Sequence, residues 1–138
     1  MNIRMHYLYA KALSDNDFSE SIQFFEDQVE KKSNYETFKM LADLYFEMGD
    51  FNLCSVLCEN LMKEVEYENN KTIVISLDIL WIKSMIKLKK ITWFQKVKAL
   101  LRFNKYKKFI LKNIGNKSPY YKELQIGKAM IMKLGQGL

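Results

Sequence analysis

Glycine and proline are scarce in this chain of 138 residues, which has five glycines and one proline. This scarcity argues against a β-sandwich, whose many turns need both residues, and against a linker-rich or disordered chain. Cysteine occurs only at Cys54 and Cys58, four residues apart, so the chain has no disulfide framework and we expect a reducing compartment. The hydrophobic share of 49% is enough for a single domain with its own core.

Long uncharged apolar runs are also missing. The most apolar stretches, TIVISL and ILWI, are separated by Asp78, and neither approaches the length of a membrane span. The N-terminal residues MNIRMHYLYAKALSD place Arg4 and His6 among the apolar side chains, unlike the continuous apolar core of a secretory signal. The sequence therefore predicts a soluble cytoplasmic protein.

The sequence also contains few residue patterns that are typical of catalytic or metal-binding sites. His6 is the only histidine, and a lone histidine beside Tyr7 and Tyr9 is more often a packing or surface residue than a catalytic one. Cys54 and Cys58 could supply two metal ligands from one helix face, but a soft zinc site needs more cysteine and histidine. No glycine-rich phosphate loop and no Ser/His/Asp set is evident. We therefore expect no enzyme activity, no metal and no cofactor.

Charge is present in quantity, but it is divided along the chain. Residues 1–78 contain 7 Lys/Arg and 15 Asp/Glu, whereas residues 79–122 contain 13 Lys/Arg and no acidic residue. An asymmetry of this kind bears on partners more than on the fold.

The stretch MGDFNLCSV, residues 48–56, joins two segments whose apolar residues recur at helical spacing. Gly49 suits the left-handed position that ends a helix, and Asp50 suits the N-cap of the next one. A shift of 33 residues aligns Asn16, Asp17 and Phe18 with this turn, and asparagine also tolerates the left-handed conformation. The sequence therefore predicts two consecutive helical hairpins, which is typical of a solenoid.

The second hairpin resembles the tetratricopeptide repeat family. Phe38, Leu41 with Ala42, and Tyr45 occupy the family's apolar and small positions, the turn at 49–51 matches its inter-helix turn, and Cys54 takes a small-residue position. Leu61 departs from the family's alanine, and the terminating proline is absent from both units. The resemblance implies an all-α superhelix of about eight antiparallel helices in one domain, with repeats at 1–34 and 35–68 and degenerate basic repeats at 69–138.

The second half reads as four further helices. NNKTIVISLDILWIKSMIKLKK predicts a long helix, which we expect to stay helical through its β-branched run TIVIS. ITWFQKVKALLRF and KYKKFILKNIG predict two shorter helices, the second ending at Gly115. Ser118 and Pro119 then predict the start of the last helix.

The resemblance also implies a concave groove lined by the first helix of each unit. Lys39 is the only residue there that fits a clamp for a peptide carboxylate, and Asp43 opposes it, so we expect a basic or apolar peptide segment instead. The alternative is that the later helices of the chain fill the groove. The candidate partner-binding residues are His6, Glu36, Lys39, Met40, Asp43, Phe46 and Glu47.

The acid-free stretch is the second candidate site. Its basic residues alternate with aromatic ones, which suits amphipathic helices with solvated lysines, an anionic membrane surface or an acidic protein, and nucleic acid least. The candidate basic surface consists of Lys96, Lys98, Arg102, Lys105, Lys107, Lys108 and Lys112.

The resemblance implies a non-catalytic protein–protein interaction module that serves as an adaptor or scaffold in a larger assembly and binds a protein or peptide partner. The alternative from the residues is a peripheral protein that binds an anionic membrane or another polyanion through residues 91–112.

Overall fold

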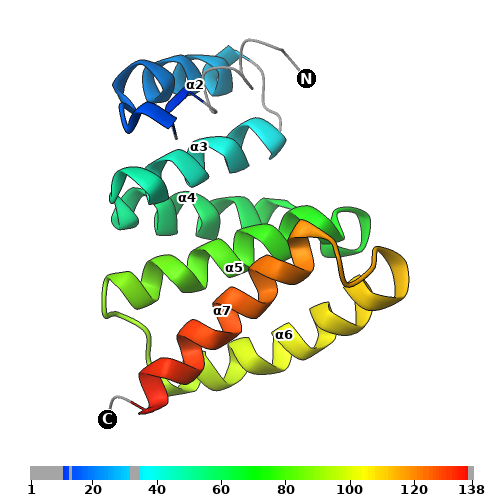
Figure 1. Ribbon diagram of the computed structural model, residues 1–138. Helices are drawn as coiled ribbons and strands as arrows, with labels where there is room; N and C mark the ends of the chain where they lie inside the picture. Colours follow the sequence, from blue (N-terminus) through cyan, green and yellow to red (C-terminus); the bar gives the residue numbers. More distant parts are fainter. Residues whose placement is uncertain (1–10, 13, 32–34, 137–138) are drawn as a thin grey trace.

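The chain folds into helices in the computed structural model, which describes residues 11–12, 14–31 and 35–136 (Figure 1). No strand occurs among these residues, so the prediction of an all-α fold is confirmed. The described elements are α2 (Ser19–Lys31), α3 (Tyr35–Met48), α4 (Phe51–Glu64), the 3₁₀-helix η1 (Tyr67–Asn69), α5 (Lys71–Lys87), α6 (Trp93–Asn113) and α7 (Pro119–Gln136).

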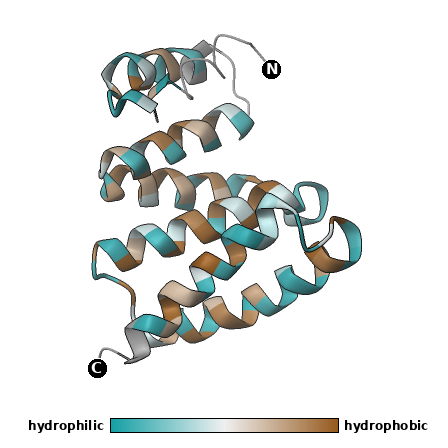
Figure 2. Ribbon diagram, in the orientation of Figure 1, coloured by the Kyte–Doolittle hydropathy of each residue, from teal (hydrophilic) through white to brown (hydrophobic). Residues whose placement is uncertain are grey.

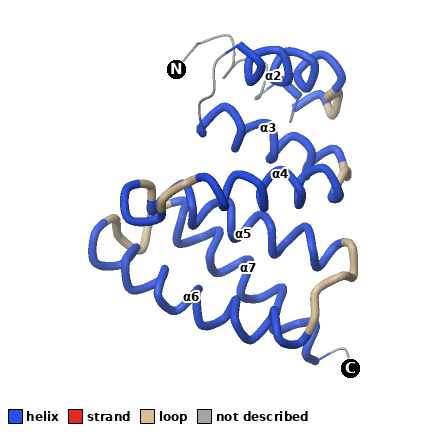
Figure 3. The backbone as a smooth tube through the Cα atoms, turned by 180° about the vertical axis from the view of Figure 1, so that it is seen from behind, coloured by secondary structure: helices blue, strands red, loops and turns tan. Residues whose placement is uncertain are grey.

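The helices form a stack in which most of them pack against their neighbours in the sequence. α2 packs on α3, α3 on α4 and α4 on α5, and α7 lies between α5 and α6. α2 and α6 lie at opposite ends of the stack in both views (Figures 1 and 3). Alternate helices also touch, since α3 contacts α5 and α5 contacts α7. This series of contacts positions the candidate site described below.

The central helix α5 belongs to both hydrophobic clusters of the core. Leu77 and Leu80 pack in the cluster shared with α2, α3 and α4, whereas Ile75 and Ile82 pack in the cluster shared with α6 and α7. A helix buried on more than one side needs apolar residues on more than one side. Hydrophobic residues accordingly recur along α5 (Figure 2). The β-branched run at 72–76 is therefore helical, as predicted, because packing outweighs a weak intrinsic propensity.

The predicted division of residues 91–115 into two helices is wrong, because α6 is one continuous helix. Its buried residues Ala99, Phe103, Tyr106 and Ile110 recur every three or four positions across the expected break at Asn104. The segment contains no glycine or proline to end a helix there, and the packed face continues through it. The second half thus holds three α-helices where four were predicted.

The turn at Gly49 has the predicted conformation. Gly49 has φ +93°, its N–H donates to the Phe46 carbonyl at 3.0 Å, and the Asp50 N–H donates to the Tyr45 carbonyl at 2.8 Å. These two bonds form a Schellman motif that satisfies the last carbonyls of α3. The Asp50 carboxylate then accepts a hydrogen bond from the Leu53 N–H at 3.2 Å, which caps α4. Asn16 has φ +55°, so both predicted left-handed positions are confirmed.

Replacing Gly49 with valine should lower the free energy of unfolding by about 1 kcal/mol or more, because a β-branched residue resists a positive φ. No atom lies within 4 Å of the added Cβ, so the effect is conformational and not a clash. Thermal melts followed by circular dichroism measure it. Asn16→Gly is the control and should be neutral or stabilising. A Gly49→Val protein that melts like the wild type would contradict the left-handed turn.

Candidate functional site

A hollow of about 200 Å³ lies where the alternating helices α3, α5 and α7 meet. The interleaved helices α4 and α6 contribute no residue to its lining. We call it the α3–α5–α7 hollow, and its lining consists of Lys39, Asp43, Phe46, Glu47, Ser76, Ile79, Leu80, Lys83, Tyr120 and Glu123.

Four of the seven predicted groove residues line this hollow. Lys39, Asp43, Phe46 and Glu47 follow one another at spacings of four, three and one, so a single face of α3 presents them. Met40 instead packs against the hydrophobic cluster of the first half. Glu36 is exposed at the start of α3 and does not line the hollow, and His6 lies outside the described residues.

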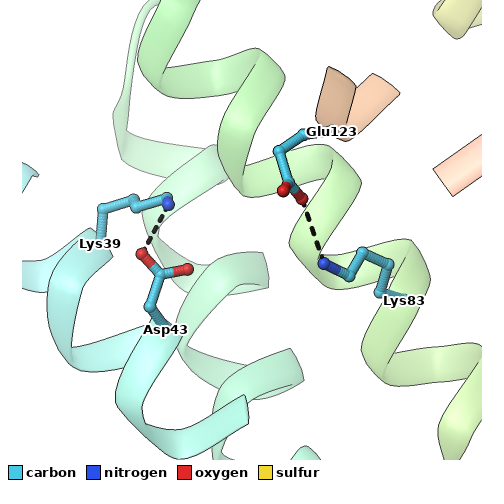
Figure 4. Close-up of polar contacts among 4 residues, drawn as sticks. All are labelled: Lys39, Asp43, Lys83 and Glu123. Carbon is cyan, nitrogen blue, oxygen red and sulfur yellow. Dashed lines mark hydrogen bonds and ion pairs between the residues drawn. The ribbon is translucent and has the colours of Figure 1, made fainter. Parts of the chain in front are cut away.

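Two ion pairs form among the residues that line the hollow (Figure 4). Within α3, Lys39 Nζ lies 2.6 Å from Asp43 Oδ2. Between α5 and α7, Lys83 Nζ lies 3.2 Å from Glu123 Oε2, and the same ammonium sits 4.8 Å from the centre of the Phe46 ring. Lys83 therefore links the three helices that form the hollow.

The charges of the hollow leave no free cation for an anionic ligand. Burial raises the pKa of Asp43, and the neighbouring Lys39 opposes this shift. Lys39 and Lys83 are both neutralised by carboxylates. The Glu47 side chain is exposed, and none of the described residues forms an ion pair with it. The hollow thus has one surplus acid above the apolar side chains of Ile79 and Leu80.

The candidate groove residues did not include the half of the hollow that comes from α5 and α7. A shift of 33 residues from Asp43, Phe46 and Glu47 leads to Ser76, Ile79 and Leu80, which all line the hollow, so the repeat spacing was a signal that could have found them. Tyr120 and Glu123 come from the first turns of α7. Two helices of the second half therefore provide more than half of the residues that line the hollow.

The seven residues of the candidate basic surface separate into different environments. Lys98, Lys105, Lys107, Lys108 and Lys112 are exposed, and Lys96 is half-buried. Arg102 instead points toward α5, where its Nε and Nη2 donate to the two carboxylate oxygens of Asp78 at 2.6 and 2.9 Å. Since Arg102 is committed to this pair, the free basic surface is formed by lysines.

The aromatic residues of the same segment include both buried and exposed side chains. Phe103 and Tyr106 are buried against α5 and α7, as expected for an amphipathic helix, and the Tyr106 hydroxyl donates to Asp78 at 2.6 Å. Trp93 and Phe94, in contrast, are 72% and 60% exposed. The inward face of α6 is thus a structural one, and its first turn presents two aromatic rings to solvent.

Cys54 and Cys58 are both fully buried in α4. The Ser84 hydroxyl donates to Cys54 Sγ at 3.1 Å, which ties α4 to α5. The hydrogen bond between the two thiols, together with burial, raises the pKa of Cys58, and the same hydrogen bond lowers the pKa of Cys54. Because neither side chain is exposed, both cysteines pack as small core residues. Within residues 11–12, 14–31 and 35–136, no three His, Cys, Asp or Glu side chains gather as a metal site would need.

None of the helices in the described part of the chain combines the length and apolarity that crossing a bilayer requires.

The chain was compared with protein families, curated proteins and solved structures. No family model, no curated protein and no solved structure matches it.

Proposed function

We propose that the chain is a non-catalytic interaction module of tetratricopeptide type, which holds a segment of a partner protein in the α3–α5–α7 hollow. The observation that carries this proposal is the origin of the lining, which comes from three alternating helices in series. Stacked helix pairs create an extended surface in this way, with each unit contacting its neighbours. A module of this kind serves as an adaptor within a larger assembly.

The size of the hollow favours a side chain of a protein segment over a small-molecule ligand. Its volume of about 200 Å³ is below the roughly 300–1,000 Å³ of most small-molecule sites. One or two anchoring side chains fit such a space, and the rest of the segment would run along the surface of α3 and α5. The partner segment would then contact α3 on one side of the hollow and α7 on the other, and both helices pack against α5.

The charges favour a segment that carries lysine or arginine among apolar residues. Both lysines of the hollow already have carboxylate partners, so a peptide carboxylate would have to displace Asp43 or Glu123. Glu47 is the group that can attract a basic side chain, and Ile79, Leu80 and Tyr120 offer apolar contact. The preferred ligand is therefore a segment that is both basic and apolar, which narrows the expectation of a basic or apolar segment.

A peptide library displayed on phage and selected on the immobilised protein tests this function. We expect enriched peptides that combine apolar residues with lysine or arginine. Reversing the charge at the exposed Glu47 (Glu47→Lys) should weaken binding of a selected peptide at least about tenfold, which corresponds to about 1.4 kcal/mol. Fluorescence anisotropy with the labelled peptide measures the change.

The matched control is Glu64→Lys. Glu64 is an exposed acid at the end of α4, outside the hollow, so this variant has the same net charge as Glu47→Lys. Its affinity for the peptide should equal that of the wild type. Equal weakening by the two variants would show that the peptide responds to net charge, and the hollow would not be the binding site.

A further inference from the structure

The outward face of α6 carries an unusual exposed apolar group. Trp93, Phe94 and Leu101 are 72%, 60% and 65% exposed, which is far more than large hydrophobic side chains normally show together. Helical spacing places Phe94 and Leu101 on the side of α6 opposite the buried residues Phe103 and Ile110, with Trp93 at the edge of that side in the first turn. No other helix covers this side, since α6 ends the stack in both views (Figures 1 and 3).

Lysines surround this apolar group. Lys89 and Lys90 are exposed in the connection that leads into α6, and Lys98 and Lys108 are exposed along the helix. Lys105 is also exposed, but its ammonium lies 4.6 Å from the centre of the Tyr67 ring of η1. The Lys98 ammonium lies 4.4 Å from the centre of the Phe94 ring. Residues 79–122 contain no acidic residue that could neutralise these lysines from within the segment. We call this set the α6 outer face: Lys89, Lys90, Trp93, Phe94, Lys98, Leu101 and Lys108.

We infer that the α6 outer face attaches the protein to an anionic lipid bilayer. Trp93, Phe94 and Leu101 enter the interfacial region, and the lysines contact the anionic headgroups. A helix with exposed aromatic and leucine side chains among lysines has the composition of an interfacial anchor. Juxtaposed lysines are attracted by the negative surface potential of such a membrane. The inference is independent of the proposed function, because no residue of α6 lines the α3–α5–α7 hollow.

The combination of charge and apolar exposure selects a bilayer over other occupants. A second copy of the chain on this face would bring lysines against lysines, which repel. A nucleic acid would satisfy the lysines through its phosphates but would leave Leu101 without apolar contact. A bilayer offers anionic headgroups and an apolar interior at the same surface.

The first test is sedimentation of the full chain with vesicles of phosphatidylcholine alone and of phosphatidylcholine with phosphatidylserine, at low and high salt. We expect binding to the anionic vesicles only, and weaker binding at high salt, because screening shortens the reach of exposed charges. Lys98→Glu with Lys108→Glu should reduce the partition coefficient at least about 25-fold, since each lysine contributes about fivefold. The control is Lys11→Glu with Lys63→Glu, two exposed lysines of the first half, with the same net charge and an expected change below threefold.

The second test separates insertion from simple adsorption. In a Trp81→Phe background Trp93 is the only tryptophan, so its emission reports on the α6 outer face. We expect a blue shift and quenching by brominated lipid on anionic vesicles. Phe94→Ser with Leu101→Ser should weaken binding about tenfold or more and reduce the quenching, with unchanged circular dichroism because both side chains are exposed.

Three results would overturn the inference. One is the absence of binding to anionic vesicles at low salt. Another is binding without any change in Trp93 emission, which would describe a general polyanion site. The third is self-association in analytical ultracentrifugation that Phe94→Ser with Leu101→Ser abolishes, which would make the face an interface between copies of the chain.

Discussion

Replacing Arg102 with methionine should lower the free energy of unfolding by about 2–4 kcal/mol, because it leaves the Asp78 carboxylate buried without its ionic partner. The Asp78 side chain is 4% exposed in the middle of α5, and Arg102 holds both of its carboxylate oxygens. Breaking a fully buried pair costs about 3–5 kcal/mol. The expected loss is smaller here since the Arg102 side chain is 37% exposed, so solvent screens part of the interaction.

Urea denaturation of the variant measures the loss, and two further variants identify its cause. Lys112→Met removes an exposed cation from the same helix and should change stability by less than about 0.5 kcal/mol. Asp78→Leu combined with Arg102→Met removes both charges and should recover most of the stability, although the Tyr106 hydroxyl then lacks its acceptor. A double variant as unstable as Arg102→Met alone would show that lost packing is the cause, not the unpaired carboxylate.

Replacing Phe103 with alanine should lower the free energy of unfolding by about 3–5 kcal/mol, because it opens a cavity where α6 meets α5 and α7. Phe103 is 1% exposed. Its ring lies against Gly127 of α7, where an added Cβ would come within 3.2 Å of Phe103 Cε2. Neighbouring atoms of packed helices relax only partially into such a space, so the loss includes both the missing contacts and the cavity.

Leu101→Ala is the matched control for this prediction. It also truncates a large apolar side chain in the same helix, but Leu101 is 65% exposed and its loss should stay within about 0.5 kcal/mol. Chemical denaturation of both variants gives the comparison. If Phe103→Ala were no less stable than Leu101→Ala, α7 would not depend on α6 for its position. The α3–α5–α7 hollow would then take its α7 side from α5 alone.

The buried face of α6 holds two neighbouring helices in place through the contacts of Arg102, Tyr106 and Phe103. Asp78 joins α5 to α6 through Arg102 and Tyr106, and Phe103 joins α6 to the backbone of α7. Phe103 lies opposite Phe94 and Leu101, which remain exposed. The inner face thus holds the stack together, and the outer face is available for the attachment inferred above.

Much of the local structure followed from short-range chemistry. Gly49 and Asn16 adopt positive φ because their own conformational preferences allow it at the ends of helices. Ser118 accepts a hydrogen bond from the Tyr121 N–H at 3.3 Å at the start of α7, as the Ser–Pro pair predicted. Lys89 also has φ +58°, but lysine gives no sequence signal of that conformation. The helix predicted over residues 69–90 therefore ends earlier than expected, at Lys87.

The sequence alone therefore determined the all-α class and the turns, because these depend on neighbouring residues and on helical periodicity. Only the tertiary structure decided that α6 is one helix and that α3, α5 and α7 share a hollow. It also showed that Arg102 is not part of the basic surface, because Arg102 pairs with Asp78. The two residues are 24 positions apart in the chain. No local pattern encodes a pairing over such a separation; it arises when packing brings one face of α6 against α5.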